Sequence, residues 1–279
     1  MSLGNLNKSA LIGSVMSFAL IFNNLSCAAT AREKKEIAMI NSRHLIALPS
    51  KARVIDLTQT LNTSVPTYDG HSGEFKYETL STITKDGYGS GAFFTHEHLG
   101  THIDAPVHFC PSGVSVDKLD PNSLVLPVVV LDVRDEVKKN PDYVLDVQKI
   151  KEFEKKNTIP AHAAALLLTG WSKRYFIEAQ YRNPDNKGIM HYPGFSVDAA
   201  KYLIDRHKIA ALGIDTLSID FGPTEEFPVH KLVLSQGLFM VENLTNLDQL
   251  PSCGAVAIFA PLKIEGGTGS PARVLALVP

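Results

Sequence analysis

Four of the ten histidines in this 279-residue chain fall within the run His96-Glu-His98-Leu-Gly100-Thr-His102-Ile-Asp104-Ala-Pro106-Val-His108-Phe109. The even positions from 98 to 108 read His, Gly, His, Asp, Pro and His, whereas the odd positions from 99 to 109 are mostly apolar. This alternation is typical of an extended segment with one apolar face, and the glycine and the proline argue against a helix. We expect the odd positions to pack inward and the even positions to present the polar side chains.

The polar face of this run has the composition of a divalent metal site. Neutral imidazole and ionised carboxylate are preferred metal ligands, and a buried polar group without a partner costs about 1–3 kcal/mol. We predict that His98, His102 and Asp104 bind one metal ion. A straight strand would hold the two histidines about 13 Å apart, so the chain must bend at Gly100, where a bend has a low steric cost. His96 is left out because it precedes this bend.

The composition excludes some classes of partner. The chain is 44% hydrophobic with a formal net charge of −2, which supports a sizeable core and gives no electrostatic case for binding nucleic acid. We expect a small-molecule partner instead.

The N-terminus differs in kind from the rest of the chain. Residues 10–22 form an apolar stretch of signal-peptide length, too short for a stable membrane span, and Ala29-Thr-Ala31 fits a signal-peptidase site. We expect a signal peptide over 1–31, a tether over 32–52 and an exported, periplasmic protein. Cys27 leaves lipid anchoring open as an alternative, and an ordinary apolar N-terminal helix is another. Of the other two cysteines, Cys110 and Cys253, the sequence does not say whether they pair.

The remaining pattern predicts a single α/β domain over 53–279 with a central mixed β-sheet, because apolar strand-like runs alternate with helical spacing. We expect strands at 54–61, 98–109, 125–133, 163–169, 210–215, 255–262 and 273–278. We expect helices near 147–153 and from the capping residue Ser196 to His207, the latter with Val197, Ala200, Leu203 and Ile204 facing inward. Residues 63–91 are rich in turn-forming residues and predict a hairpin or a loop over a site.

A metal site needs further ligands downstream, and two residues are candidates. His230 lies in Phe227-Pro-Val-His230, and Glu242 interrupts an apolar stretch. From burial alone, Glu242 is either buried with a partner or solvated.

The His-rich run resembles the defining motif of the cyclase family, which includes bacterial kynurenine formamidases and isatin hydrolases. The similarity continues in Thr169-Gly170-Trp171, in Gly213-Ile-Asp215 and in the closing run from Gly266 to Arg273. The resemblance covers roughly residues 53–279 and implies a swivelling β/β/α fold, usually assembled as a homodimer or a dimer of dimers.

The resemblance also implies roles for site residues. It implies that His98, His102 and Asp104 hold one metal, that Asp104 bridges to a second metal held by His230 and Glu242, and that His108 is the general acid/base. His230 and Glu242 have the twelve-residue spacing of the formamidases. Export and chain length fit the isatin-hydrolase-like branch better, in which one manganese is typical. Zn²⁺ or Mn²⁺, and one metal or two, therefore stay open.

The function that follows is metal-dependent hydrolysis of an amide or lactam C–N bond in a small aryl substrate, isatin-hydrolase-like, with N-formylkynurenine as the alternative substrate. We expect Trp171 to contribute an aromatic wall, and the Phe93–Phe94 pair to be plain core. A non-catalytic exported metal- or small-molecule-binding protein is the competing class. A related hydrolase acting on another cyclic amide or a lactone also stays open.

Overall fold

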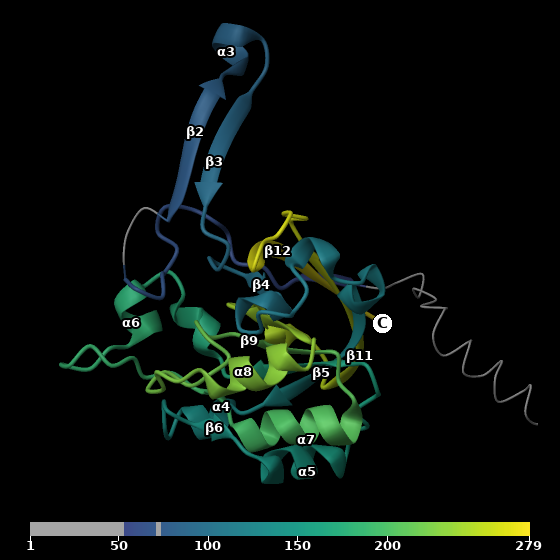
Figure 1. The fold of residues 1–279 in the computed structure, drawn as a ribbon. Helices are drawn as coiled ribbons and strands as arrows, with labels where there is room; N and C mark the ends of the chain where they lie inside the picture. The colour runs from purple at the N-terminus through teal and green to yellow at the C-terminus, as the bar shows by residue number, and fades with distance from the viewer. Residues whose placement is uncertain (1–52, 71–73) are drawn as a thin grey trace, which may run out of the picture. The chain divides into compact units, whose positions relative to one another are not determined.

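The fold is organised by one large sheet that closes on itself. The computed structural model describes residues 53–70 and 74–279, and every structural statement below concerns that part of the chain. The sheet has the order β1-β12-β11-β5-β7-β9-β10-β4, and β4 also pairs with β12, so seven strands form a closed, barrel-like ring (Figure 1). The strands are β1 (Arg53–Asp56), β4 (His102–Asp104), β5 (Val125–Asp132), β7 (Ala164–Leu168), β9 (Ala211–Ile214), β10 (Phe239–Glu242), β11 (Cys253–Pro261) and β12 (Gly269–Val278).

The ring has a parallel half and an antiparallel half, which carry different sequence patterns. Strands β5, β7, β9 and β10 run parallel, and all residues of β7, β9 and β10 are buried. Such continuous apolar runs are expected where both faces of a parallel strand are covered. In the antiparallel half, β11 alternates between buried and partly exposed residues.

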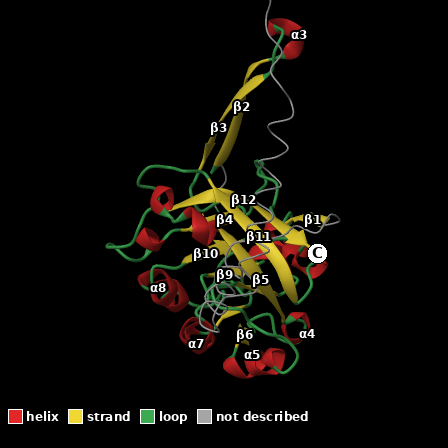
Figure 2. Ribbon diagram, turned by 90° about the vertical axis from the view of Figure 1, so that its right-hand side faces the viewer, coloured by secondary structure: helices red, strands yellow, loops and turns green. Residues whose placement is uncertain are grey.

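Helices cover the outer face of the parallel half. Figure 2 shows α5 (Val147–Glu154), α7 (Val197–His207) and α8 (Pro228–Ser235) on one side of the sheet. Val129 and Leu131 of β5 pack into the apolar layer beneath the helices, whereas Leu126, Val128 and Val130 of the same strand pack into the second core cluster, together with residues of β4, β11 and β12. The two cores therefore lie on opposite faces of β5.

The expected α/β class with a mixed sheet is confirmed, and most expected elements are present. Ser196 caps α7 by accepting a hydrogen bond from the Ala199 backbone N–H. Val197 was expected to face inward, but it is 37% exposed because it begins the first turn, beyond the edge of the packed face. The predicted strand at 54–61 ends at Asp56, and the predicted 98–109 strand contracts to β4.

Shorter elements complete the description. They are the helices α4 (Arg134–Val137) and α6 (Glu178–Arg182), the strand pair β6 (Val144–Leu145) and β8 (Gly194–Phe195), and the 3₁₀ turns Pro106–His108, Val116–Lys118, Pro121–Leu124, Trp171–Arg174 and Leu247–Gln249.

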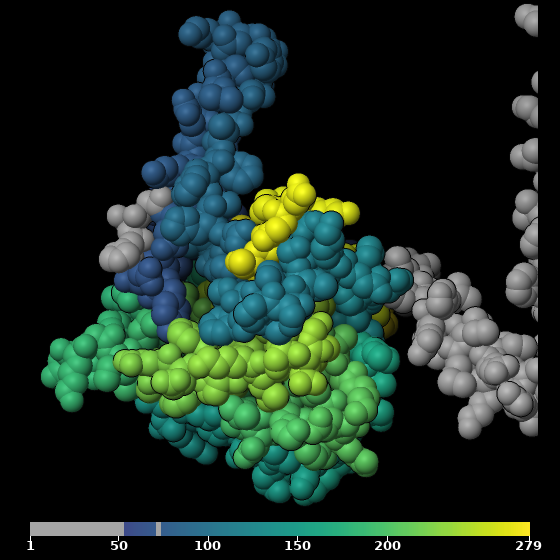
Figure 3. All heavy atoms as spheres, viewed as in Figure 1, coloured from purple at the N-terminus to yellow at the C-terminus, as the bar shows by residue number. Residues whose placement is uncertain are grey.

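A hairpin projects from this body. It consists of β2 (Phe75–Ser81) and β3 (Ser90–Thr95), with the short helix α3 (Ile83–Asp86) at its tip, and it stands away from the sheet in Figures 1 and 3. Phe93 and Phe94 lie on it and are 58% and 53% exposed, so the expectation that they are plain core is wrong. Sequence alternation on an isolated hairpin cannot reveal that neither face is covered.

Three further sequence-based expectations concern the N-terminal segment, membrane spanning and the cysteines. The predicted signal peptide, tether and Cys27 lie outside the described residues. No helix among the described residues is long and apolar enough to cross a bilayer. Cys110 and Cys253 are free thiols and do not form a disulfide.

Candidate active site

The site begins at the bend in the His-rich run. Gly100 has φ of +64°, and a Cβ there would lie 2.6 Å from Leu61 Cδ2, so the position needs glycine for both its backbone conformation and its space. His98 lies in the turn before it, and β4 starts two residues after it, at His102. The predicted bend at Gly100 is confirmed.

The strand register brings downstream residues to this bend. Strand β4 lies between β10 and β12, and Glu242 of β10 is directly opposite His102. Residues directly opposite on neighbouring strands point to the same face, so the carboxylate and the imidazole meet. Glu242 is 4% exposed, which settles that it is buried with partners rather than solvated.

The five predicted ligands lie together around Asp104. Asp104 Oδ1 lies 2.5 Å from His98 Nδ1 and 3.2 Å from His102 Nε2, and Asp104 Oδ2 lies 3.6 Å from His230 Nε2. Glu242 adds its two oxygens, Oε2 at 3.5 Å from His102 Nε2 and Oε1 at 3.3 Å from His230 Nε2. The structure therefore brings together all five residues predicted to hold metal, although it leaves their ligand role a prediction.

The second nitrogen of each imidazole is held by a hydrogen-bond partner. His102 Nδ1 donates to the Gly100 carbonyl oxygen at 2.8 Å, and His230 Nδ1 pairs with Asp220 Oδ2 at 2.7 Å. His98 Nε2 lies 2.9 Å from the Thr268 hydroxyl. Such outer partners fix the orientation of each ring, so that its other nitrogen faces Asp104.

Two of these partners, Asp220 and Thr268, are not predicted from the sequence. Asp220 also accepts hydrogen bonds from the backbone N–H groups of Val229 and His230, so it caps the start of α8 and orients His230 at once. The Thr268 hydroxyl donates to Glu97, which leaves its oxygen free to accept from His98. A carboxylate ten residues before a candidate ligand is a weak signal, and Thr268 carries none beyond its place in the glycine-rich closing run.

The charge balance of the cluster fits a cation. Asp104 Oδ2 is buried without a hydrogen-bond partner among the described residues. Burial acts to lower the pKa of His102, but Asp104 and Glu242 outweigh it and raise that pKa to about 9. The protein thus draws positive charge to this point, and a divalent cation would satisfy the unpaired oxygen and the lone pairs together. Two sets of three side chains in the described part of the chain are close enough together to hold a metal ion, and both include Asp104. One set adds His98 and His108, and the other adds His102 and Glu242.

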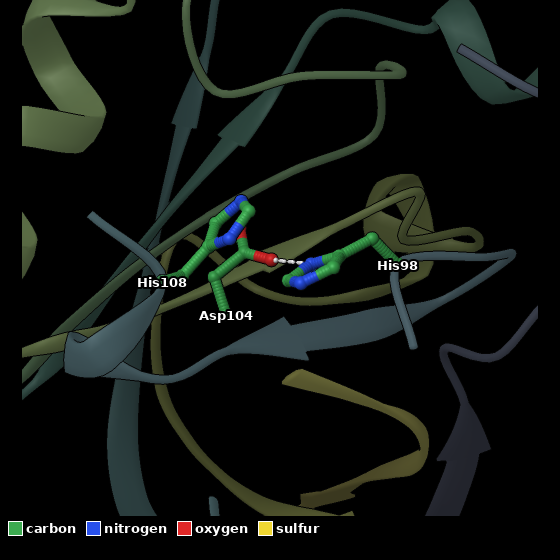
Figure 4. A group of neighbouring side chains, drawn as sticks. All are labelled: His98, Asp104 and His108. Atoms are coloured by element: carbon green, nitrogen blue, oxygen red, sulfur yellow. Dashed lines mark hydrogen bonds and ion pairs between the residues drawn. The ribbon is translucent and has the colours of Figure 1, made fainter. Parts of the chain in front are cut away.

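The His108 ring lies beside this cluster and makes no hydrogen bond to the other described residues. Its ring stacks on that of His98 with the centroids 3.9 Å apart, and Figure 4 shows His98, Asp104 and His108 turned toward one another. Burial lowers the pKa of His108 to about 4, helped by the neighbouring imidazoles of His98, His230 and His102 and opposed by Asp104. At neutral pH its imidazole is uncharged and able to accept a proton.

The cluster forms the floor of a cavity of about 410 Å³. Three aromatic side chains line it, Tyr68, Phe109 and Phe227, and the Phe109 and Phe227 ring centroids are 5.6 Å apart. Trp171 does not line this cavity. It is 1% exposed, its indole N–H donates to the Tyr181 carbonyl oxygen, and Arg174 lies over its ring. The aromatic wall is thus made by residues other than the predicted tryptophan, which packs in the core because it follows the buried strand β7.

Comparison with known proteins identifies the family. The family model described as a putative cyclase matches residues 55–221. The chain belongs to the cyclase family. This cyclase-family hydrolase is 36% identical over 249 residues to the isatin hydrolase of Roseibium aggregatum, covering 83% of this chain and 94% of that protein. It is 27% identical over 224 residues to the kynurenine formamidase of Bacillus thuringiensis subsp. konkukian, covering 79% of this chain and 95% of that one.

Solved structures agree with this assignment. An isatin hydrolase bound to the product analogue thioisatinate superposes on the cyclase-family chain with a TM-score of 0.76 at 34% identity, covering 90% of this chain and 100% of that one. A structure described as a potential metal-dependent hydrolase with cyclase activity has a TM-score of 0.63 at 26% identity, covering 82% and 98%. The predicted family and enzyme class are confirmed.

Proposed function

We propose that this hydrolase cleaves the amide C–N bond of a small aryl lactam such as isatin. The observation that carries the proposal is the convergence of three imidazoles and two carboxylates at the floor of a cavity with an aromatic wall. The similarity to isatin hydrolases at 34–36% identity favours the lactam. The similarity to kynurenine formamidases makes N-formylkynurenine the second candidate.

The cluster is suited to hold Zn²⁺ or Mn²⁺ through His98, His102 and Asp104, with His230 and Glu242 completing the same site or holding a second ion. When bound, the cation supplies Lewis-acid polarisation of the substrate carbonyl and lowers the pKa of water. The identity and number of the ions are open to elemental analysis of the purified protein, for which a ratio of one or two per chain is the expected result.

His108 moves the proton in this proposal. Its neutral imidazole accepts a proton from the attacking water while the water oxygen bonds to the amide carbonyl carbon. The same ring then donates that proton to the nitrogen as the C–N bond breaks, which leaves a carboxylic acid and an amine. An imidazolium ion in a site that lowers its pKa to about 4 gives up its proton readily, so the second transfer is favourable.

The wall residues hold the aryl ring of the substrate. Tyr68, Phe109 and Phe227 present ring faces and edges to the cavity, and aromatic pairs of this kind favour a bound arene. Phe227 has φ of +49°, an uncommon conformation for a bulky residue. It immediately precedes α8, the helix that carries His230.

The test compares two substrates and two variants. We expect the wild-type protein to hydrolyse isatin, and H108A to keep its metal while turnover falls by roughly 10²–10⁴-fold. We expect H102A to lose metal and turnover together. Full metal occupancy and normal turnover in H102A would contradict the site, and loss of metal in H108A would make His108 a ligand. Faster hydrolysis of N-formylkynurenine than of isatin would favour the second candidate.

We further propose that the chain forms a homodimer through the β2–β3 hairpin. The hairpin exposes six large apolar side chains, Tyr77, Leu80, Ile83, Tyr88, Phe93 and Phe94. An isolated two-stranded hairpin is marginal in water, and large exposed apolar patches mark association surfaces. Light scattering after size exclusion should give a dimer for the wild type and a monomer for F93S/F94S. A monomeric wild type would overturn this part of the proposal.

Export is proposed from the sequence of residues 1–31 alone. N-terminal sequencing of the protein recovered from its native host should find cleavage after Ala31. An intact Met1, or a lipid-modified Cys27, would replace the proposed periplasmic soluble form.

A further inference from the structure

Ser218 has a hydroxyl that the fold itself does not use. Its side chain is 3% exposed, and its Oγ has no hydrogen-bond partner among the described residues. Leaving a buried hydroxyl unpaired destabilises a protein, so an unpaired hydroxyl at a ligand cavity points to a partner that arrives with the ligand. Ser218 lines the same cavity as His230 and Glu242.

The backbone on both sides of Ser218 is fixed. The Thr216 hydroxyl donates to the Ser218 carbonyl oxygen at 2.7 Å, and the next residue, Ile219, donates its N–H to Glu242 Oε1 at 2.8 Å. The Asn243 N–H holds the Thr216 carbonyl oxygen at 2.9 Å. Only rotation about one side-chain bond stays free, so the hydroxyl is pre-organised beside the metal cluster at little entropic cost.

We propose that Ser218 is a positioning residue that donates a hydrogen bond to a ketone oxygen of the substrate. This inference rests on the proposed function and narrows its substrate class. Isatin and N-formylkynurenine share an aryl ketone on the ring carbon next to the one that carries the scissile amide nitrogen. A hydroxyl donor beside the cluster can hold that ketone while the amide carbonyl faces the ligand residues. The preferred substrates are therefore ortho-acyl anilides, either cyclic or open.

The experiment is a double comparison of substrate and side chain. N-(2-acetylphenyl)formamide carries the ketone, and formanilide lacks it. We measure kcat/KM for both substrates with the metal-loaded wild-type enzyme and with metal-loaded S218A. Intrinsic differences in amide reactivity cancel in the ratio of ratios, so only the contribution of Ser218 to ketone recognition remains.

We expect S218A to reduce kcat/KM about tenfold for the ketone substrate and less than about twofold for formanilide, as loss of one hydrogen bond predicts. S218C, whose thiol is a weak donor of similar size, should fall between S218A and the wild type. Metal content should be unchanged. The unfolding temperature of S218A should be equal to or above that of the wild type, because the substitution removes an unpaired buried group.

The matched control is S270A. Ser270 is also buried, but its Oγ accepts from the Leu262 N–H and donates to the Pro271 carbonyl oxygen. We expect S270A to lower the unfolding temperature and to leave the substrate ratio unchanged.

Each of the following results would overturn the inference. Equal losses for both substrates would show a general rather than a ketone-specific role, and a lower unfolding temperature in S218A would show that the hydroxyl serves the fold. No turnover of isatin, N-formylkynurenine or either anilide by the wild type would remove the proposed function together with this inference. If S218A kept its turnover and the wild-type ratio of kcat/KM between the ketone substrate and formanilide, only this inference would be rejected.

Discussion

Two buried aspartates in this structure have opposite surroundings. Asp215 accepts hydrogen bonds from the Thr169 N–H at 2.9 Å, the Thr169 hydroxyl at 2.6 Å and the Gly170 N–H at 2.8 Å. Asp104 faces imidazole nitrogens, and its Oδ2 has no hydrogen-bond partner within residues 53–70 and 74–279. The two residues are 0% and 1% exposed, so burial alone does not separate them.

The difference teaches how to tell a structural carboxylate from a ligand. The donors around Asp215 belong to the backbone and side chain at the end of β7, and they join that strand to the end of β9. The cluster around Asp104 consists of imidazole nitrogens and the Glu242 carboxylate. No distribution of protons over these groups gives every nitrogen and oxygen a hydrogen-bond partner. Asp215 therefore serves the fold, and the surroundings of Asp104 support its proposed role as a ligand of a cation.

The largest expected effect comes from D104N. We expect this substitution to reduce metal content and to lower turnover by roughly 10²–10³-fold or more, because it replaces one oxygen of the carboxylate that faces all three imidazoles with an amide nitrogen. Elemental analysis and kinetics measure the two quantities. Unchanged metal content in D104N would remove Asp104 from the proposed ligand set.

D215N should show the reverse pattern. Replacing one carboxylate oxygen with an amide NH₂ places a donor against the donors of residues 169–170, and we expect a loss of about 1–3 kcal/mol in unfolding free energy. Metal content per folded chain should be unchanged, because no ligand contacts this carboxylate in the described residues. Urea unfolding with elemental analysis checks both statements. A folded D215N that has lost its metal would end the distinction between the two aspartates.

The pH dependence of stability sharpens the comparison further. Burial raises the pKa of Asp215 to about 6, partly offset by the hydrogen bonds from residues 169, 170 and 172. Because the folded-state pKa lies above the unfolded one, this contribution is fully present below pH 3.8 and is lost as the pH rises through 6. The stability advantage of wild type over D215N should therefore shrink by about 1–3 kcal/mol between pH 4 and pH 7. A constant difference across urea titrations in this range would contradict the raised pKa.

The smallest effect is expected at an exposed aspartate. Asp56 pairs with Arg273 through two hydrogen bonds of 3.0 and 2.7 Å, and the two side chains are 43% and 63% exposed. Burial is the largest single influence on the Asp56 pKa and raises it, but the hydrogen bonds from Arg273 and Thr58 and the Arg273 charge together outweigh burial and lower the pKa. Solvent screens such a pair, so D56N should cost less than about 1 kcal/mol, and the cost should fall further in 1 M salt. A larger loss would show that solvent exposure does not limit what this ion pair contributes to stability.

The sequence anticipates the part of the site that is local. Alternation from 98 to 108, together with Gly100, predicts the bend and the three clustered ligands, because five intervening residues restrict where His98 and Asp104 can go. The spacing of His230 and Glu242 adds the downstream pair only through resemblance to a family. The β10 register that places Glu242 opposite His102 is a tertiary fact.

Other parts could not be predicted because their contacts join distant segments. Thr268 meets His98 across 170 positions, and no local pattern identifies it. Trp171 was expected to line the cavity but is buried in the core, whereas Phe93 and Phe94 were expected in the core but are exposed. Hydrophobicity predicts burial but does not predict which surface covers a given ring.

The amino-acid sequence by itself determined the chemistry available to this protein. It supplied a dense set of imidazoles and a carboxylate on one edge of a bent strand, with apolar runs long enough to build a sheet. Only the tertiary structure decided which carboxylate is satisfied and which is not. Among the described residues, hydrogen-bond donors reach both oxygens of Asp215 but not Asp104 Oδ2, because chain segments far apart in sequence pack around the two residues differently.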